Sequence, residues 1–204
     1  MANLVTFSRF LLVLAAILVA YTPPTPWRLL AVPLLILAFV TDAVDGYLAR
    51  SRGETSNFGA MLDIAVDRIV EISLWVVLAD LDLVPVWVPL IFIARGGLVD
   101  TIRGEASART GKAPFDTVSG SVGRFLVAGA FVRTFYAVLK ATAFCWLFLI
   151  HGLAPAAGGI EGEWGDGLRR VGDWLVYGSV ALCLLRGLPV IGGYLARLRE
   201  RHAG

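Results

Sequence analysis

Long apolar stretches recur along this chain, and they constrain its fold more than any other feature of the sequence. A helix needs about 20 mainly apolar residues to span a bilayer. Reading the sequence in windows of that length predicts helices at Leu4–Tyr21, Leu29–Tyr47, Gly59–Ala79, Val86–Ile102, Val122–His151 and Trp174–Leu198. Only 17% of the residues are charged, against about 25% in a typical soluble domain. The chain is therefore expected to lie in a lipid bilayer.

The fold expected is an all-α integral membrane protein, a bundle of six transmembrane helices that forms one domain over residues 1–204. Lipid admits only helices and closed barrels, and the apolar stretches lack the alternation of barrel strands. The glycine-rich stretch Gly152–Gly167 is expected to be a turn before the last helix. The formal net charge of +2 is too small to favour nucleic-acid binding.

Basic residues gather in alternate loops, and this predicts the orientation of the chain. The loops on one side, together with the C-terminal tail, hold Arg50, Arg52, Arg103, Arg109, Lys112, Arg197, Arg199 and Arg201. Loops on the other side balance their basic residues with acidic ones. Because Lys and Arg are retained in cytoplasmic loops, both termini are expected in the cytoplasm, in a multi-pass protein of the inner membrane. The loop between the second and third helices then also faces the cytoplasm.

Four aspartates flank that loop, and they carry the strongest chemical signal in the sequence. Spacings of three and four residues place each pair on one helix face, and the pairs are Asp42 with Asp45 and Asp63 with Asp67. A charge in the bilayer costs about 2.5–3.5 kcal/mol, so these acids need compensation. Arg50 and Arg68 are the nearest cations in the sequence, and two arginines cannot balance four acids. Ion pairs inside the bundle are the alternative to a metal site.

Two divalent ions would supply the missing charge. Oxygen ligands without His or Cys favour hard ions, Mg²⁺ or Mn²⁺, over zinc. Two such ions suit an in-line displacement at phosphorus. Gly46 and Ala49 beside the acids permit close approach, either of a ligand or of another helix. The planar guanidinium of Arg50 suits a diphosphate, although it could equally anchor the chain at the membrane surface.

The run from Asp42 to Asp67 resembles the signature of the CDP-alcohol phosphotransferase family. The pattern is D-x2-D-G-x2-A-R-x8-G-x3-D-x3-D, and this chain keeps every spacing with Asp42, Asp45, Gly46, Ala49, Arg50, Gly59, Asp63 and Asp67. The resemblance implies six transmembrane helices, a cytoplasmic active site and a homodimer. It also implies transfer of the phosphatidyl group of CDP-diacylglycerol to an alcohol, with release of CMP.

The resemblance also implies roles for the matching residues. Asp42, Asp45 and Asp63 would be the core metal ligands, while Asp67 would help to bind the second ion and act as general base on the acceptor hydroxyl. Asp45, Gly46, Ala49, Arg50 and Gly59 would belong to the site for CDP-diacylglycerol.

A second element of the resemblance lies at the N-terminus. Asn3, Thr6 and Arg9 fit an N-x2-T-x2-R pattern that precedes the first helix in many phosphatidylglycerophosphate synthases, where it looks like part of the nucleotide pocket. The alternatives are a helix cap for Thr6 and an interfacial anchor for Arg9.

Further arginines indicate which alcohol the chain accepts, because a phosphorylated alcohol needs fixed cations to bind its phosphate. Arg95, Arg103 and Arg124 are predicted to bind its phosphate, and Arg133 and Arg186 are expected to point into the bundle. These features favour glycerol 3-phosphate as acceptor and phosphatidylglycerophosphate as product. Gly96 departs from the A-R-E element of those synthases, so inositol phosphate remains the runner-up.

Two further alternatives stay open. Cardiolipin and phosphatidylserine synthases belong to the same family that this chain resembles, and they use other alcohols. Intramembrane carboxylates also mark transporters, here of divalent cations, but such proteins usually show inverted repeats and acids near the bilayer centre. This sequence shows no such repeat, and its four aspartates cluster towards one face.

Overall fold

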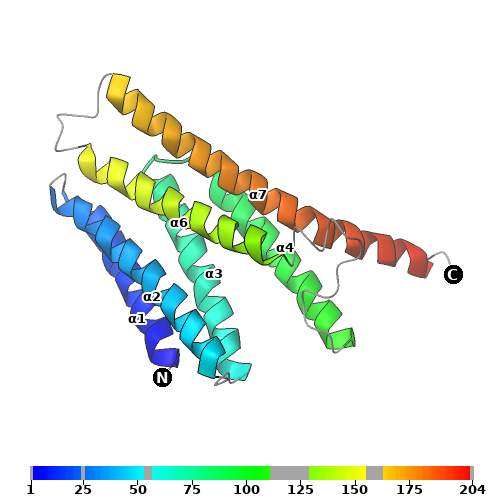
Figure 1. Ribbon diagram of the computed structural model, residues 1–204. Coiled ribbons are helices and arrows are strands. Elements are labelled where there is room, and N and C mark those ends of the chain that lie inside the picture. The colour runs from blue at the N-terminus through cyan, green and yellow to red at the C-terminus, as the bar shows by residue number, and fades with distance from the viewer. Residues whose placement is uncertain (1, 24–25, 53–56, 111–128, 155–162, 203–204) are drawn as a thin grey trace. The chain divides into compact units, whose positions relative to one another are not determined.

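The structure is a computed structural model that describes residues 2–23, 26–52, 57–110, 129–154 and 163–202 (Figure 1). Side chains are described at 7–23, 26–44, 64–102, 104–105, 129, 131–154, 164–195 and 199. The elements are α1 (Ala2–Ala20), the 3-10 helix η1 (Pro26–Leu30), α2 (Ala31–Arg52), α3 (Asn57–Asp80), α4 (Trp87–Thr110), α6 (Ala130–Leu153) and α7 (Glu163–His202). The all-α class is therefore confirmed for the described residues.

Three helical segments among the described residues are long and apolar enough to cross a membrane, namely Pro26–Val44, Phe131–Leu153 and Trp164–Leu195. In α1 the apolar segment Phe7–Ala20 is shorter. Helices α3 and α4 have 24 residues each, which is about 36 Å at a rise of about 1.5 Å per residue. Their charged side chains interrupt the apolar runs. The chain is thus a multi-pass membrane protein, and the number of six spans stays a prediction.

Several helix boundaries differ from those expected, and α4, for example, continues to Thr110 instead of ending at Ile102. Helix α2 continues to Arg52, so Asp42 and Asp45 lie inside it rather than at its end. Helix α7 begins at Glu163, so the prediction of a turn extending to Gly167 was wrong. A glycine inside a helix costs only about 1 kcal/mol, which tertiary contacts can outweigh. One such contact holds the start of α7, because the indole Nε1 of Trp146 donates to the carbonyl of Leu168 at 3.0 Å.

The chain divides into two compact units. Unit 1 comprises Met1–Val86 and Ala141–Leu175, and unit 2 comprises Trp87–Lys140 and Val176–Gly204. Helices α1, α2 and α3 belong to unit 1 and α4 to unit 2, while α6 and α7 contribute to both. That the two units function as one domain stays a prediction.

In unit 1, α1 packs against both α2 and α3. Alanines allow this close approach, because Ala16 and Ala20 of α1 and Ala38 of α2 are fully buried. Larger side chains fill the space between α3 and α6, where the ring centroids of Trp75 and Phe144 lie 4.7 Å apart. This packing sets the N-terminal part of α1 beside the helices that carry the aspartates.

In unit 2, α4 and the C-terminal part of α7 lie together. Val99 of α4 and Val190 of α7 form a buried apolar cluster with Ile102 and Ile191. Further along both helices, the Tyr194 hydroxyl donates to the carboxylate of Glu105 at 2.7 Å. These contacts fix the register in which the basic side chains of α4 and α7 meet.

Candidate active site

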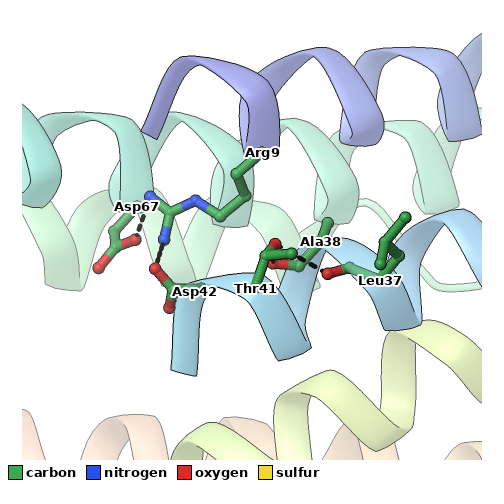
Figure 2. Close-up of polar contacts among 6 residues, drawn as sticks. All are labelled: Arg9, Leu37, Ala38, Thr41, Asp42 and Asp67. Atoms are coloured by element: carbon green, nitrogen blue, oxygen red, sulfur yellow. Dashed lines mark hydrogen bonds and ion pairs between the residues drawn. The ribbon is translucent and has the colours of Figure 1, made fainter. Parts of the chain in front are cut away.

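Two of the signature aspartates come together at one arginine. The Nη1 atom of Arg9, on α1, donates to Oδ1 of Asp42 on α2 (Figure 2). Its Nη2 atom forms an ion pair of 2.7 Å with Oδ1 of Asp67 on α3. We call Arg9, Asp42 and Asp67 the acidic site. It joins residues far apart in the sequence, from three helices.

The packing of α1 against α2 and α3 explains why Arg9 reaches both carboxylates. A guanidinium on an apolar helix rarely faces lipid, and once buried it needs anionic partners. Its planar fork offers separate N–H groups to two acceptors. The Arg9 side chain is only 4% exposed, whereas those of Asp42 and Asp67 are 44% and 54% exposed. The positive charge therefore lies inside, and the carboxylates reach towards the surface.

Arg9 is the described cation that compensates these acids, and the sequence did not single it out for this role. Arg68, one of the two cations named from the sequence, pairs instead with Glu71 of its own helix at 3.0 Å. The side chain of Arg50, the other cation, lies outside the described residues. The sequence did contain a signal for this contact. An arginine at the start of an apolar helix needs an acidic partner nearby, which could have pointed to Arg9 as a partner of the aspartates.

Thr41 precedes Asp42 and bonds within its own helix. Its hydroxyl lies 2.8 Å from the carbonyl oxygen of Leu37 and 3.0 Å from that of Ala38 (Figure 2). Such bonds to the preceding turn satisfy a hydroxyl where water is scarce. The Thr41 hydroxyl thus bonds to the backbone of its own helix, at the residue before Asp42.

Several predicted site residues have backbones in the described helices but side chains outside the described set. They are Asn3 and Thr6 in α1, Asp45, Gly46, Ala49 and Arg50 in α2, Gly59 and Asp63 in α3, and Arg103 in α4. Arg124 lies outside the described residues altogether. Because α1 begins at Ala2, Thr6 is inside the helix and does not cap it. The proposed roles of this set stay predictions.

The described part of the acidic site fits a hard divalent cation. Asp42 and Asp67 supply carboxylate oxygens, the ligands that Mg²⁺ and Mn²⁺ prefer, and both side chains are about half exposed. Among the side chains that the structure describes, no three acidic, histidine or cysteine residues gather in a group. A complete metal site would therefore need Asp45 and Asp63, whose side chains fall outside that set.

Basic residues gather in unit 2, on three helices. Arg186 of α7 is 6% exposed, and its guanidinium carbon lies 5.3 Å from the centre of the Tyr136 ring. Arg95 of α4 lies beside the next residue of α7, because a Cβ added to Gly187 would be 3.0 Å from the Arg95 Cγ. Both Arg95 and Arg133 act electrostatically on Arg186. We call Arg95, Arg133 and Arg186 the arginine cluster.

The arginine cluster has the chemistry of an anion site. Like charges held close together in a medium of low dielectric repel strongly, and a bound anion relieves that repulsion. The inward orientation expected for Arg186 is confirmed by its burial, whereas Arg133 is exposed. Phosphate geometry suits several guanidinium groups at once.

Comparison with known proteins agrees with these features. Residues 1–185 match the family of CDP-alcohol phosphatidyltransferases. The "CDP-diacylglycerol--glycerol-3-phosphate 3-phosphatidyltransferase" of Escherichia coli K12 is 35% identical over 205 residues, which cover 98% of this chain and 94% of that protein. The match spans both units, and it sets aside the transporter alternative.

Other relatives align over shorter stretches. The Bacillus subtilis protein with the same name is 37% identical over 70 residues, 34% of this chain and 36% of the relative. An Arabidopsis thaliana protein named "Probable CDP-diacylglycerol--inositol 3-phosphatidyltransferase 2" is 37% identical over 79 residues, 39% of this chain and 33% of the relative. The chain thus spans only about a third of the length of these two relatives. Since the family match covers most of the chain and the E. coli relative aligns almost end to end, the chain belongs to the CDP-alcohol phosphatidyltransferase family.

Proposed function

We propose that this chain transfers the phosphatidyl group of CDP-diacylglycerol to glycerol 3-phosphate, releasing CMP and forming phosphatidylglycerophosphate. The observation that carries the proposal is the meeting of Asp42 and Asp67, from two helices, at one site within an intact family signature. The end-to-end similarity to a glycerol-3-phosphate enzyme supports the choice of acceptor. Inositol phosphate is the second candidate, since a relative named for inositol also aligns.

Two divalent ions are part of the proposal, because the family generally depends on divalent metals. Asp42, Asp45, Asp63 and Asp67 would hold Mg²⁺ or Mn²⁺. When bound, such ions neutralise phosphate oxygens and make the phosphorus more electrophilic. Asn3, Thr6, Gly46, Ala49, Arg50 and Gly59 would contact CDP-diacylglycerol.

The chemistry assigned to the chain itself is proton transfer and positioning. The acceptor hydroxyl oxygen attacks the β-phosphorus of CDP-diacylglycerol, and the bond from that phosphorus to the CMP oxygen breaks. Asp67 takes the hydroxyl proton, which a carboxylate about half exposed can accept from a ligand at the surface of the bundle. Asp42 and Asp67 are fixed from different helices, so α2 and α3 together orient the reacting groups.

The arginine cluster supports a phosphorylated acceptor. Arg95 of α4 lies against Gly187, the residue after Arg186 on α7, and Lys140 adds a positive charge 4.4 Å from the Tyr136 ring. A phosphate dianion would offset this concentration of charge, whereas an uncharged alcohol would not. Arg103 and Arg124 are retained as further candidates for the same phosphate.

The proposal is completed by the arrangement of the chain in the membrane. We place it as a homodimer of six-span subunits in the inner membrane, with both termini and the active site in the cytoplasm and residues 1–204 acting as one domain. The length of α3 and α4 supports spans at these charged helices, since about 36 Å exceeds the hydrocarbon thickness of about 30 Å. Reagent labelling of single cysteines placed in each loop tests the orientation.

An acceptor panel tests the function. Purified protein, CDP-diacylglycerol and Mg²⁺ are incubated separately with glycerol 3-phosphate, inositol phosphate, serine and phosphatidylglycerol, and the lipid product is identified in each case. Phosphatidylglycerophosphate is the expected product, with CMP released in equal amount. Formation of the inositol lipid alone would refute the acceptor assignment. Full activity after removal of divalent ions by a chelator would refute the metal assignment.

A further inference from the structure

Arg9 places a positive charge where the proposed metal ions would have to bind. Its guanidinium contacts Asp42 and Asp67 with two different nitrogen atoms and is almost fully buried. The two carboxylates lie on α2 and α3, and α1, which carries Arg9, packs against both helices. Arg9 is therefore fixed by packing rather than by a mobile loop.

The carboxylates retain the capacity to bind a metal while they contact Arg9. Arg9 contacts the Oδ1 atom of each acid. A carboxylate has two oxygens and about four lone-pair sites, so one ion pair does not exhaust it. A divalent cation bound to the same acids would nevertheless lie close to the guanidinium. The two positive charges repel, and burial of Arg9 strengthens that repulsion because little water screens it.

From this arrangement we infer that Arg9 is a built-in counter-ion of the metal-binding carboxylates, which pairs Asp42 and Asp67 and competes with a divalent cation for them. The inference rests on the proposed function, from which it takes the metal ions. Arg9 is a positioning residue, since it acts through the two acids. A consequence is that metal binds weakly alone and more tightly with CDP-diacylglycerol, whose diphosphate offsets the charge of Arg9.

Two other roles for Arg9 predict different behaviour. If Arg9 only fastened α1 to α2 and α3, its removal would disorder the acids and weaken metal binding. If Arg9 only contacted the diphosphate of the nucleotide, its removal would leave metal binding in the absence of nucleotide unchanged. Competition alone predicts tighter metal binding when the charge of Arg9 is removed. The direction of the change in metal affinity therefore separates the three roles.

The test measures Mn²⁺ binding to the purified full chain in detergent, without nucleotide, by the electron paramagnetic resonance signal of free Mn²⁺. Arg9→Met removes the charge and keeps the apolar stem, and Arg9→Gln removes the charge but keeps an amide donor for the carboxylates. Both are expected to bind Mn²⁺ about tenfold more tightly than the unaltered protein, since a close like charge is gone. Arg9→Lys keeps the charge and should stay within about threefold of the unaltered protein.

Arg68→Met is the matched control. It removes the same charge from the residue next to Asp67, and the guanidinium of Arg68 is paired with Glu71 of its own helix at 3.0 Å. Because Glu71 already offsets the charge of Arg68, removing that charge should change Mn²⁺ affinity by no more than about twofold. Unchanged or weaker binding in the neutral Arg9 variants would overturn the inference, and so would an equal gain in Arg9→Lys or Arg68→Met. Should Arg9→Met not fold, Arg9→Gln decides the same question.

The design separates this inference from the proposed function. If the unaltered protein binds Mn²⁺ and the neutral Arg9 variants bind it no more tightly, only the role of Arg9 fails. If the unaltered protein binds no Mn²⁺ even with CDP-diacylglycerol present, the metal assignment of the proposed function fails, and the inference falls with it.

Discussion

The acidic site and the arginine cluster differ in the sign of the charge that each accumulates. In unit 1, two carboxylates about half exposed are joined by one buried guanidinium, so a single positive charge faces two negative ones. In unit 2, the buried Arg186 has Arg95 and Arg133 as charged neighbours, so positive charge accumulates. In the proposed function the acidic site gains cations and the arginine cluster gains an anion. The difference separates the residues that should control chemistry from those that should control acceptor binding.

The largest effect is expected in the acidic site, from Asp67→Asn. Loss of the proposed proton acceptor and metal ligand should lower turnover by about 1,000-fold or more. Binding of CDP-diacylglycerol should remain largely intact, because the amide keeps the size of the side chain. CMP release measures turnover, and equilibrium binding of the nucleotide lipid measures affinity.

The control for that change is Asp82→Asn, the same substitution in the turn after α3. Asp82 has a φ of 55°, a conformation that asparagine tolerates, and should retain full activity. Near-normal turnover of Asp67→Asn would remove Asp67 from the mechanism.

In the arginine cluster, Arg186→Met should weaken acceptor binding rather than chemistry. Losing a charge-assisted bond to phosphate is worth about 1.5–3 kcal/mol, which corresponds to an increase of roughly 10- to 100-fold in the KM for glycerol 3-phosphate. Mn²⁺ binding should not change. The thermal midpoint should be equal or higher, because repulsion from Arg95 and Arg133 is relieved.

Arg170→Met serves as control on the same helix, since Arg170 is exposed and its Nε donates to the carbonyl of Asp166. It should leave the KM unchanged. If Arg186→Met lowered the thermal midpoint and kcat while leaving the KM alone, the arginine cluster would be structural and the contrast with the acidic site would disappear.

A smaller effect is expected from Gly187→Ala, which adds a methyl group against the Arg95 stem. The new Cβ would lie 3.0 Å from Cγ and 3.4 Å from Nε of Arg95, so the guanidinium must shift. Overpacking of this kind costs about 1 kcal/mol or more, and a rise of about fivefold in the KM for glycerol 3-phosphate is expected. Steady-state kinetics at saturating CDP-diacylglycerol measure it.

Gly178→Ala is a close control, because its added Cβ would meet only the Leu139 side chain at 3.6 Å, an ordinary contact. Its KM should match that of the unaltered protein. Equal effects of the two substitutions would mean that helix propensity, and not the position of Arg95, governs the result.

The same two regions show how far the sequence predicts the structure. The apolar stretches predicted the helices, and helical spacing placed Asp42 with Asp45 and Asp63 with Asp67. The short loop between the second and third helices then predicted that the two pairs lie near each other. The role of Arg9 depends on how α1 packs against α2 and α3, which no spacing in the sequence encodes. The beginning of α7 at Glu163 was missed for a related reason, since its glycines are weak helix breakers that tertiary contacts override.

The arginine cluster could be predicted from the sequence only in part. Burial of Arg186 followed from its place in an apolar helix, so the sequence was sufficient. Its nearness to Arg95 depends on Gly187, whose missing side chain leaves room for the arginine stem. Spacing within one helix could not reveal that contact, because the two arginines come from helices about ninety residues apart in the sequence.

The smallest effect is expected away from both regions, at the contact between the ends of α1 and α3. The Tyr21 hydroxyl donates to the carboxylate of Asp80, and this bond, with some burial and the negative charge, raises the pKa of Tyr21 from 10.0 to about 12. A raised pKa means that the bond stabilises the fold fully below pH 10 and ceases to do so as the pH passes through about 12. Tyr21→Phe should therefore lower the thermal midpoint by about 1–2 °C at neutral pH, and this difference should vanish towards pH 12.

Asp80→Asn sharpens that test, because it removes the charge that opposes ionisation of Tyr21. In this variant the pKa of Tyr21 should return towards 10.0, as followed by the ultraviolet difference spectrum against the matching Tyr21→Phe protein. Neither variant should alter Mn²⁺ affinity or the KM for glycerol 3-phosphate, since neither changes a residue of the acidic site or the arginine cluster. A pKa of Tyr21 near 10.0 in the unaltered protein would contradict the bond to Asp80. A change in the Mn²⁺ affinity or in the KM would show that the end of α3 is coupled to the acidic site or to the arginine cluster. The packing of α1 against α3 would then contribute to the properties of that site, and the two regions could not be compared without it.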